Sequence, residues 1–433
     1  MPSVIKSMTA TVAKLQQIQP ATMASDRTFE NYTRQLTLIE DFIASLRQKG
    51  LHQTFKTVDF KHLTETNRLP GKNHARVVVR APMGTRHVFK GFDLEAFINH
   101  KDKDNSFHQH QRDTMLHEIQ TLAALPLHPN IMPCPETLVT VLDPDGGERV
   151  CGFLQPVMER ETLDDQITNA GDVRIPLLRK AKWCFQMARA VLHTHRIART
   201  YHMDVKPGNI LIDQEDGIRL IDWEQSGVSM FTHSKEATID QEAWEEPPSP
   251  NDESAQPAKP RIVYKPRVGA PRKNLFWGYP EWNVFPIWKE TCPRAAELAE
   301  VFSLGRVMWM LMEQLEQSPN PTVWTARSAD VPQYWKDVIN QCMELDPNAR
   351  PDLDELVDFW SAEVERLSGA KGASNGTNHS TGISTSNSMN SGASNGVGKS
   401  INNSISTGTR NGTSNGTFHN GSNGAGNNSS SHV

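Results

Sequence analysis

The stretch Tyr201-His202-Met203-Asp204-Val205-Lys206-Pro207-Gly208-Asn209 is followed by a second acidic segment, Asp222-Trp223-Glu224. The first stretch offers a carboxylate, an ammonium and an amide carbonyl, and the second adds a carboxylate 18 residues after Asp204. A carboxylate can accept the proton of an attacking hydroxyl, and a lysine can stabilise charge on a migrating phosphoryl group. An amide oxygen and a further carboxylate can hold magnesium on nucleotide phosphates. This set of groups suits phosphoryl transfer.

Two short apolar runs separate these segments. Ile210-Leu211-Ile212 and Ile218-Arg219-Leu220-Ile221 flank a turn-forming stretch, Asp213-Gln214-Glu215-Asp216-Gly217. The pattern predicts a hairpin that brings Asn209 back beside Asp222. The alternative is an ordinary turn with a helix-breaking proline, but the paired acidic segments at this spacing favour a site.

The loop resembles the catalytic loop of eukaryotic protein kinases, H-R-D-L-x-x-x-N, because Asn209 follows Asp204 by five residues. Lys206 in D-x-K-P-x-N resembles the serine/threonine-specific branch, and Asp222-Trp223-Glu224 stands where the family has D-F-G. The resemblance implies an α+β, two-lobed fold: a small β-rich N-lobe with one key helix, and a larger α-helical C-lobe. It also implies ATP and Mg²⁺, with Asp204 as the catalytic base, Lys206 stabilising the transferring group, and Asn209 and Asp222 holding the metal.

The resemblance extends towards the N-terminus. His87-Val88-Phe89-Lys90 is similar to the family's V-A-I-K, whose lysine pairs with nucleotide phosphates and with a helix glutamate. Glu118 is the candidate partner, because it lies on a predicted helix just before His128-Pro129-Asn130-Ile131, a tetrapeptide similar to the turn after the kinase regulatory helix. Taken alone, Lys90 could equally be a solvated lysine at a strand end.

The nucleotide-binding hinge has no side-chain signature of its own. When Glu161-Thr162-Leu163 is aligned with the family's G-S-L, the backbone N–H of Met158 faces the adenine and Gln155 becomes the gatekeeper. This register could shift by a residue or two. The later motif Glu300-Val301-Phe302-Ser303-Leu304-Gly305 resembles D-V-W-S-L-G, with glutamate for aspartate.

Asp346-Pro347-Asn348-Ala349-Arg350-Pro351 resembles the late D-P-x-x-R-P motif of the family. The arginine of that motif normally pairs with the glutamate of A-P-E, and either Glu281 or Glu290 could take this role. The alternative for Arg350 is a surface arginine that caps a turn.

Three departures from the family pattern limit what the resemblance implies. No G-x-G-x-x-G precedes Lys90, and only the isolated Gly71 and Gly84 are found there, so nucleotide should be held more weakly or clamped differently. Met203 replaces the arginine of H-R-D, so phosphorylation of the activation loop should not act through the usual ion pair. Glu224 replaces the glycine of D-F-G, which should restrict backbone flipping.

The hydrophobic pattern predicts individual elements. Val77-Val78-Val79 and Val88-Phe89 flank Pro82-Met83-Gly84 and predict a hairpin. Helices are expected at about 113–125, through 178–192 and at 295–315. A helical apolar stripe also precedes the N-lobe, made by Leu36, Leu38, Ile39, Phe42, Ile43 and Leu46. It indicates either a docking helix or, as we favour, a helix packed on the neighbouring lobe.

These patterns divide the chain into successive parts. We expect an N-terminal helical extension at 1–52, a kinase N-lobe at 53–159, a kinase C-lobe at 160–368, a mobile activation-segment insert at 234–274 and a disordered Ser/Asn/Gly-rich tail at 369–433. The insert opens acidic, closes basic and is rich in proline, so it cannot bury enough apolar surface to order itself.

Composition restricts the partners and the compartment. A net charge of −5 gives no basic field for nucleic acid. No stretch reads as a signal peptide or a membrane span, and the 5 cysteines form no C-x-x-C pair. We therefore expect an intracellular protein, cytoplasmic or nuclear, with a thin basic cluster at 265–273 that could serve nuclear import. The sequence does not reveal the oligomeric state.

Three functions are compatible with these observations. The first is an active, divergent serine/threonine kinase that transfers phosphate from ATP to a protein hydroxyl. The second is a pseudokinase that acts as a binding or scaffold module, and the third is a kinase of a small metabolite on the same fold. The full set of separated polar groups argues against the second, because a scaffold has no physical need for them.

Overall fold

A mixed sheet forms the N-terminal half of the protein, in strand order β2-β6-β7-β5-β4-β3 with β1 paired to β7. The computed structural model describes residues 23–68, 75–80, 84–99, 105–225, 228–229, 231–237, 241–246, 261–266, 294–315 and 322–374. The strands of this sheet are β1 (Thr37–Leu38), β2 (Lys56–Asp59), β3 (Leu63–Arg68), β4 (Ala75–Arg80), β5 (Thr85–Gly91), β6 (Thr137–Leu142) and β7 (Glu148–Pro156). Valine-rich β4 pairs with β5 from Arg80 opposite Thr85 onwards, which confirms the predicted hairpin.

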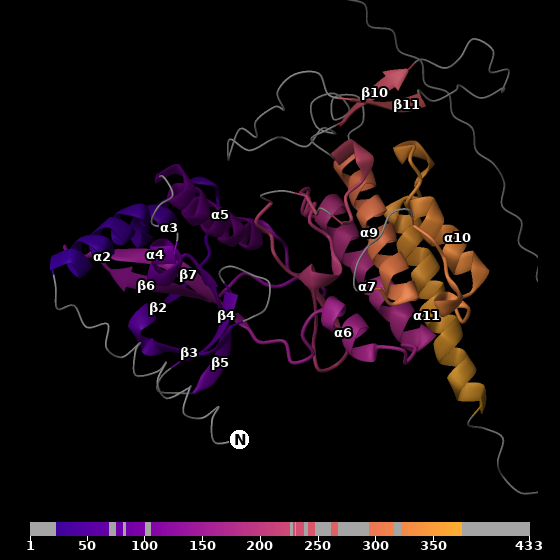
Figure 1. The fold of residues 1–433 in the computed structure, drawn as a ribbon, viewed down its shortest axis with the longest axis horizontal. Coiled ribbons are helices and arrows are strands. Elements are labelled where there is room, and N and C mark those ends of the chain that lie inside the picture. The colour runs from indigo at the N-terminus through magenta and orange to yellow at the C-terminus, as the bar shows by residue number, and fades with distance from the viewer. Residues whose placement is uncertain are drawn as a thin grey trace, which may run out of the picture. The chain divides into compact units, whose positions relative to one another are not determined.

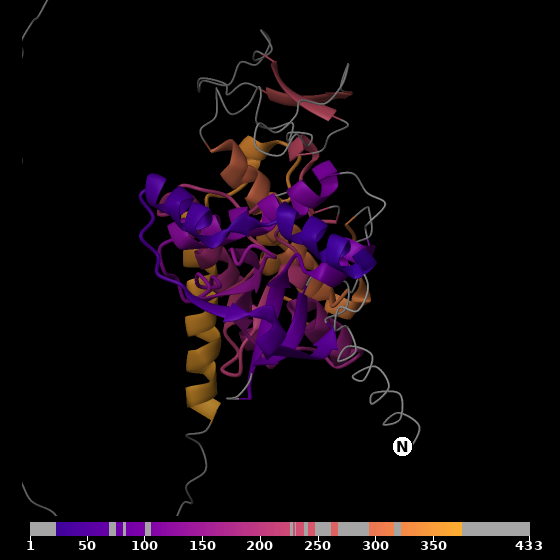
Figure 2. The ribbon, with the colours of Figure 1, turned by 90° about the vertical axis from the view of Figure 1, so that its left-hand side faces the viewer.

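Helices cover this sheet. They are α2 (Met23–Gln35), α3 (Ile39–Gln48), α4 (Leu94–Asn99) and α5 (Asn105–Ala124). In both ribbon views α2, α3 and α5 lie on the same side of the sheet (Figures 1 and 2). The N-terminal apolar stripe is not one helix, because Leu38 belongs to β1 and pairs with Arg149 of β7. Phe42 and Leu46 are buried with residues of α5, so the helix packs on the neighbouring lobe.

The C-terminal half is mainly helical. Its helices are α6 (Leu163–Ala170), α7 (Leu177–Arg196), α9 (Ala295–Glu313), α10 (Gln333–Cys342) and α11 (Leu353–Ser374). A capping box starts α6, because Thr162 and Asp165 satisfy each other's backbone N–H groups. Helix α7 packs against α9 and α11 around a core that includes five fully buried tryptophans: Trp183, Trp223, Trp309, Trp335 and Trp360. The expected two-lobed α+β architecture is confirmed.

Two expectations about element boundaries need correction. Helix α5 begins at Asn105, well before the expected start near residue 113, because its polar first two turns carry no apolar stripe. Helix α11 runs to Ser374 and crosses the boundary expected at 368. The rest of the tail lies outside the described residues.

The insert at 234–274 contains more structure than a mobile loop. Strands β10 (Gln241–Glu246) and β11 (Arg261–Pro266) form a two-stranded antiparallel sheet within it. The run Ile262-Val263-Tyr264 has high strand propensity, and a ladder satisfies backbone groups without a large core. Gly71, Glu281 and Glu290 lie outside the described residues, as does most of the basic cluster at 265–273.

None of the described helices combines the length and the apolar composition that crossing a bilayer requires.

Candidate active site

The loop at residues 201–209 ends in one turn of 3-10 helix, Pro207–Asn209. Asn209 is fully buried there, and its side-chain nitrogen donates to the backbone oxygen of Asp204 at 2.9 Å and to the Asp204 carboxylate at 2.8 Å. The Lys206 ammonium lies 2.6 Å from the same carboxylate. The three polar residues singled out in this loop therefore meet around one carboxylate group.

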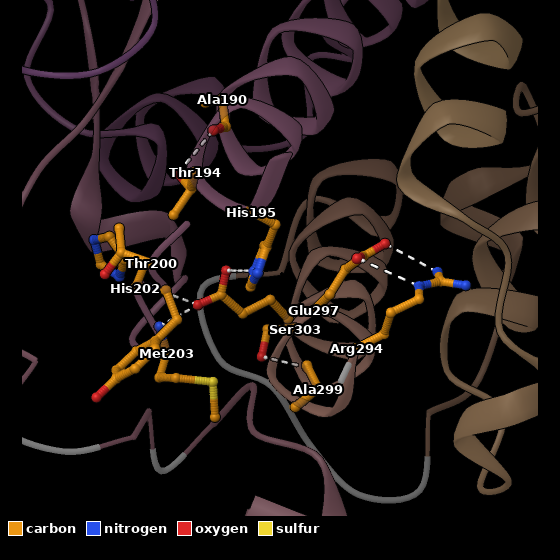
Figure 3. Close-up of polar contacts among 12 residues, drawn as sticks. Ala190, Thr194, His195, Thr200, His202, Met203, Arg294, Glu297, Ala299 and Ser303 are labelled. Carbon is orange, nitrogen blue, oxygen red and sulfur yellow. Dashed lines mark hydrogen bonds and ion pairs between the residues drawn. The ribbon is translucent and has the colours of Figure 1, made fainter. Parts of the chain in front are cut away.

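Helix α9 fixes the backbone of this loop through Glu300, which is fully buried. One of its carboxylate oxygens accepts the backbone N–H groups of His202 and Met203, both at 2.5 Å. The other oxygen lies 2.7 Å from Nε2 of His195 in α7, and Figure 3 shows His195 near His202 and Met203 of the loop. Met203 is held at φ +63°, an unfavourable conformation for a residue with a side chain, and the two hydrogen bonds stabilise it.

The hairpin β8 (Ile210–Ile212) and β9 (Ile218–Leu220) returns the chain to Asn209, as predicted. The backbone N–H of Ile221 donates to the carbonyl oxygen of Asn209 at 3.0 Å. Asp222 follows directly and adopts φ +72°. A positive φ costs free energy for aspartate, so the surrounding contacts must select this direction of the carboxylate.

The side chain of Lys90, in β5, contacts both α5 and the Asp222 segment. Its ammonium lies 2.6 Å from Glu118 of α5, 2.5 Å from Asp222 and 3.0 Å from Glu224. Glu118 is buried and also accepts the backbone N–H of Trp223 at 3.2 Å. Ion pairs thus join α5, Lys90 and Asp222, and the backbone of Ile221, the residue before Asp222, joins this segment to Asn209 and its partner Asp204.

The charges of this cluster are strongly coupled. Burial disfavours the ammonium of Lys90, but Asp222, Glu118 and Glu224 outweigh it and raise the pKa of Lys90 well above its usual value. Burial also raises the pKa of Glu118, against the opposing effect of Lys90. Three carboxylates around one ammonium leave an excess of negative charge that a cation would neutralise.

Trp223 supports the cluster from the core. It is fully buried and shares a hydrophobic cluster with Leu122 of α5, as expected for a heavier substitute of phenylalanine. Its ring packs edge-to-face on His202 with centroids 4.7 Å apart, and His202 Nε2 lies 2.7 Å from the carbonyl oxygen of Ile221. The loop and the Asp222 segment are therefore packed as one unit.

The segment proposed as the hinge follows β7. Gln155 is buried in β7 and pairs with Val88 of β5, two residues before Lys90. Met158 lies beyond the end of β7, and its carbonyl oxygen accepts the N–H of Glu161 at 3.4 Å. The carbonyl of Glu161 in turn accepts the N–H of Ile212, which joins this segment to the β8–β9 hairpin.

The guanidinium of Arg350 contacts two backbone carbonyl groups and one aromatic ring. It donates to the carbonyl oxygens of Glu344 and Leu298, at 2.8 Å and 2.9 Å, and lies over the ring of Phe302. It therefore joins α9 to the segment before α11, and the two candidate glutamates lie outside the described residues.

Sequence reasoning missed three features of the site. Glu224 was noted as a substitution, but its ion pair with Lys90 was not foreseen. His195 contacts the Glu300 carboxylate that holds the loop, Gln225 contacts the loop itself, and neither belongs to a family motif. Only three-dimensional proximity identifies them, because their partners are distant in sequence.

The fold and the arrangement of the site are those of a two-lobed domain of the protein kinase type. Residues 93–244 match the family model of the protein kinase domain, a range that contains α5, the loop of Asp204 and the Asp222 segment. This part of the chain is a protein kinase domain, that of a kinase or of a pseudokinase. No curated protein matches the chain at a significant level.

Proposed function

We propose that the protein is an ATP- and Mg²⁺-dependent protein kinase that transfers the γ-phosphoryl group of ATP to a serine or threonine hydroxyl of a protein. One observation carries this proposal: Lys90 contacts Asp222, the preceding residue Ile221 donates its backbone N–H to Asn209, and Asn209 donates to Asp204. These residues come from different elements, and phosphoryl transfer is the chemistry that needs them together.

Each residue has a distinct role in this proposal. Asp204 accepts the proton of the substrate hydroxyl. The hydroxyl oxygen forms a bond to the γ-phosphorus, and the bond between the γ-phosphorus and the leaving ADP oxygen breaks. Lys206, held against Asp204, stabilises charge on the transferring group. Lys90, oriented by Glu118, binds the nucleotide phosphates, and the N–H of Met158 binds the adenine.

The donor set fits magnesium. The Asp222 side chain is 13% exposed and supplies a hard anionic oxygen. The amide nitrogen of Asn209 donates to Asp204, which leaves the amide oxygen as the ligand atom. Mg²⁺ prefers such oxygen ligands and shares them with phosphate oxygens. Asp222 and Asn209 would hold the ion, which would neutralise charge on the nucleotide phosphates.

A pseudokinase is the second candidate, and one contact favours it. The Glu224 carboxylate lies 3.0 Å from Lys90, where it competes with phosphate for the ammonium. Together with the missing glycine-rich loop, this predicts weak nucleotide binding.

Phosphate incorporation into a generic basic protein tests the proposal. We expect Asp204→Asn to lower incorporation by about 10²–10⁴-fold, the usual contribution of a positioned base, and to retain nucleotide binding. Asp145→Asn, the same change at an exposed turn, is the matched control and should transfer at the wild-type rate. Equal residual incorporation by the Asp204→Asn variant and the wild type would remove Asp204 from the mechanism.

Thermal unfolding then separates a kinase from a scaffold. Mg-ATP at millimolar concentration should raise the melting temperature of the wild type, since a ligand that binds the native state stabilises it. The shift should shrink in Asp222→Ala, which lacks the metal ligand. No shift in either protein, combined with no incorporation, would favour the scaffold function.

A further inference from the structure

Gln225 directly follows the Asp222-Trp223-Glu224 segment, and its side chain joins two distant elements. Its amide nitrogen donates to the carbonyl oxygen of Tyr201 at 2.5 Å and to Oγ1 of Thr200 at 3.1 Å. Its amide oxygen lies 2.9 Å from Nε2 of His117 in α5. The side chain therefore spans from α5 to the start of the catalytic loop.

The hydrogen-bond donors and acceptors in this bridge are determined by chemistry. The carbonyl of Tyr201 can only accept, so the nitrogen of the Gln225 amide must face the loop. The amide oxygen then faces α5, and His117 must donate to it from Nε2. No charged group is required on either side of the bridge.

His117 lies beside Glu118, so the contact between His117 and Gln225 is linked to the ion pair of Glu118 with Lys90. Glu118 holds Lys90 and accepts the backbone N–H of Trp223. Two adjacent side chains of α5 thus contact the segment at 223–225: Glu118 at the backbone N–H of Trp223 and His117 at the side chain of Gln225. A shift of α5 that breaks the pair between Lys90 and Glu118 also strains the contact between His117 and Gln225.

The catalytic loop offers no cation at the position that precedes Asp204. Met203 is buried with Ala237 and Leu298, and it contributes packing and no charge. Gln225 contacts the loop at Thr200 and Tyr201, a few residues before the catalytic carboxylate. Figure 3 shows Thr200 beside His202 and Met203, whose backbone is held by α9.

We propose that Gln225 is a positioning residue that couples the placement of α5 to that of the catalytic loop through neutral hydrogen bonds, without a phosphate group. This inference rests on the proposed kinase function for its catalytic consequence and on the contacts above for the coupling itself. Gln225 adopts φ +51°, an unfavourable conformation for a residue with a side chain, and its hydrogen bonds at both ends oppose relaxation.

Hydrogen exchange of the full-length protein tests the coupling without any need for catalysis. Gln225→Met keeps the length of the side chain and removes its hydrogen bonds. We expect faster exchange in both 112–122 of α5 and 198–206 of the loop, about tenfold for the loss of one or two net hydrogen bonds. Gln214→Met, at an exposed turn of the β8–β9 hairpin, is the control and should change neither segment.

His117 variants test the other end of the bridge. His117→Leu should raise exchange in the same two segments, and the double variant with Gln225→Met should exceed neither single variant. His117→Gln keeps an N–H donor of similar reach and should restore slow exchange. Effects confined to one segment, or multiplied in the double variant, would overturn the coupling.

Steady-state kinetics give the catalytic readout. Gln225→Met should lower kcat by about tenfold and change the KM for ATP by less than about threefold, because the loop and not the hinge is disturbed. If the variants change hydrogen exchange as expected but the wild type transfers no phosphate, the proposed function is wrong and the coupling through Gln225 stands. If phosphate transfer is normal and hydrogen exchange is unchanged in every variant, only the coupling through Gln225 is wrong.

Discussion

Lys180 of α7 has a fully buried side chain, which is unusual for a lysine. Its ammonium donates to the carbonyl oxygen of Met312 at the end of α9, at 3.2 Å. Burial, with a contribution from the charge of Arg174, lowers the pKa of Lys180 to about 8. The folded protein therefore holds this proton less tightly than the unfolded chain does.

We expect Lys180→Met to stabilise the protein at pH 7 by about 1–2 kcal/mol. The lowered pKa corresponds to an unfavourable free energy of about 3 kcal/mol in the wild type, which the variant avoids. Loss of the hydrogen bond to Met312 offsets part of this gain. The carbonyl of Met312 keeps a donor, because Arg174 also binds it. Below pH 8 the lysine is charged in both states, so the full effect is present. Between pH 8 and 10.5 the folded state loses its proton first, wild-type stability rises, and the advantage of the variant shrinks.

Urea unfolding at pH 7 and at pH 9.5 measures this difference. Lys182→Met is the matched control, because Lys182 is exposed on the same helix, and it should leave the free energy of unfolding within about 0.5 kcal/mol. A Lys180→Met variant that is less stable than the wild type at pH 7 would show that the ammonium has partners strong enough to offset its burial.

At the scale of single residues, the sequence predicted the identity of the site better than its connections. Asp204, Lys206 and Asn209 are close in sequence, so their spacing alone indicated that they meet. Lys90 and Glu118 required the family resemblance, because no local pattern distinguishes them from solvated residues. Their roles in catalysis stay predictions. The ion pair of Glu224 with Lys90 could not be predicted from the spacing of residues in the sequence.

Helix α9 shows how one element can hold a loop that has no regular structure of its own. Glu300 accepts two buried backbone N–H groups from the loop and one contact from His195. Despite burial, His195 and these hydrogen bonds lower the pKa of Glu300. The carboxylate is thus charged in the folded protein at neutral pH, and it replaces water for two donors that would otherwise be unsatisfied.

We expect Glu300→Ala to lower the free energy of unfolding by about 3–5 kcal/mol, because it leaves buried donors without an acceptor. Glu300→Gln keeps one acceptor oxygen and should cost about 1 kcal/mol at neutral pH. The pKa of Glu300 is depressed in the folded state, so its stabilising effect is present above about pH 4.5 and is lost as the pH falls below that value. The difference between the wild type and Glu300→Gln should therefore decrease in acid.

Chemical denaturation of these variants between pH 3.5 and 7 provides the measurement. Glu365→Gln, on the exposed side of α11, is the control and should have a small effect at all pH values. If Glu300→Gln and Glu365→Gln differ from the wild type by the same amount at pH 7, the carboxylate does not hold the loop.

Elements with a local hydrophobic pattern were predicted well. The hairpins β4–β5 and β8–β9 and the helices α7 and α9 were expected close to where they lie, because period and turn residues are local signals. The apolar stripe near Leu36 was misread as one helix, since pairing of β1 with β7 is a non-local contact. The β10–β11 sheet was missed because prolines and charges around it indicated a loop.

At the scale of the whole molecule, α2, β1 and α3 are part of the same compact unit as the two lobes. Tyr32 is fully buried and donates to the carbonyl oxygen of Phe92 at 2.9 Å. Leu46 of α3 is buried in a cluster with Met115 and Ile119 of α5, which flank Glu118 in sequence. The N-terminal segment thus packs on the helix that orients Lys90, and the lobe is incomplete without it.

We expect Leu46→Ala to lower the free energy of unfolding by about 2–4 kcal/mol, because the change leaves a cavity between α3 and α5. Leu127→Ala is the same chemical change at a side chain that is 84% exposed, and it should cost less than about 0.5 kcal/mol. Where both variants are still fully folded, hydrogen exchange of α5 should be faster in Leu46→Ala alone, since α5 has lost part of its support. Equal stability of the two variants would mean that α3 only covers the lobe, and that Glu118 is held in place by the sheet and the Asp222 segment without it.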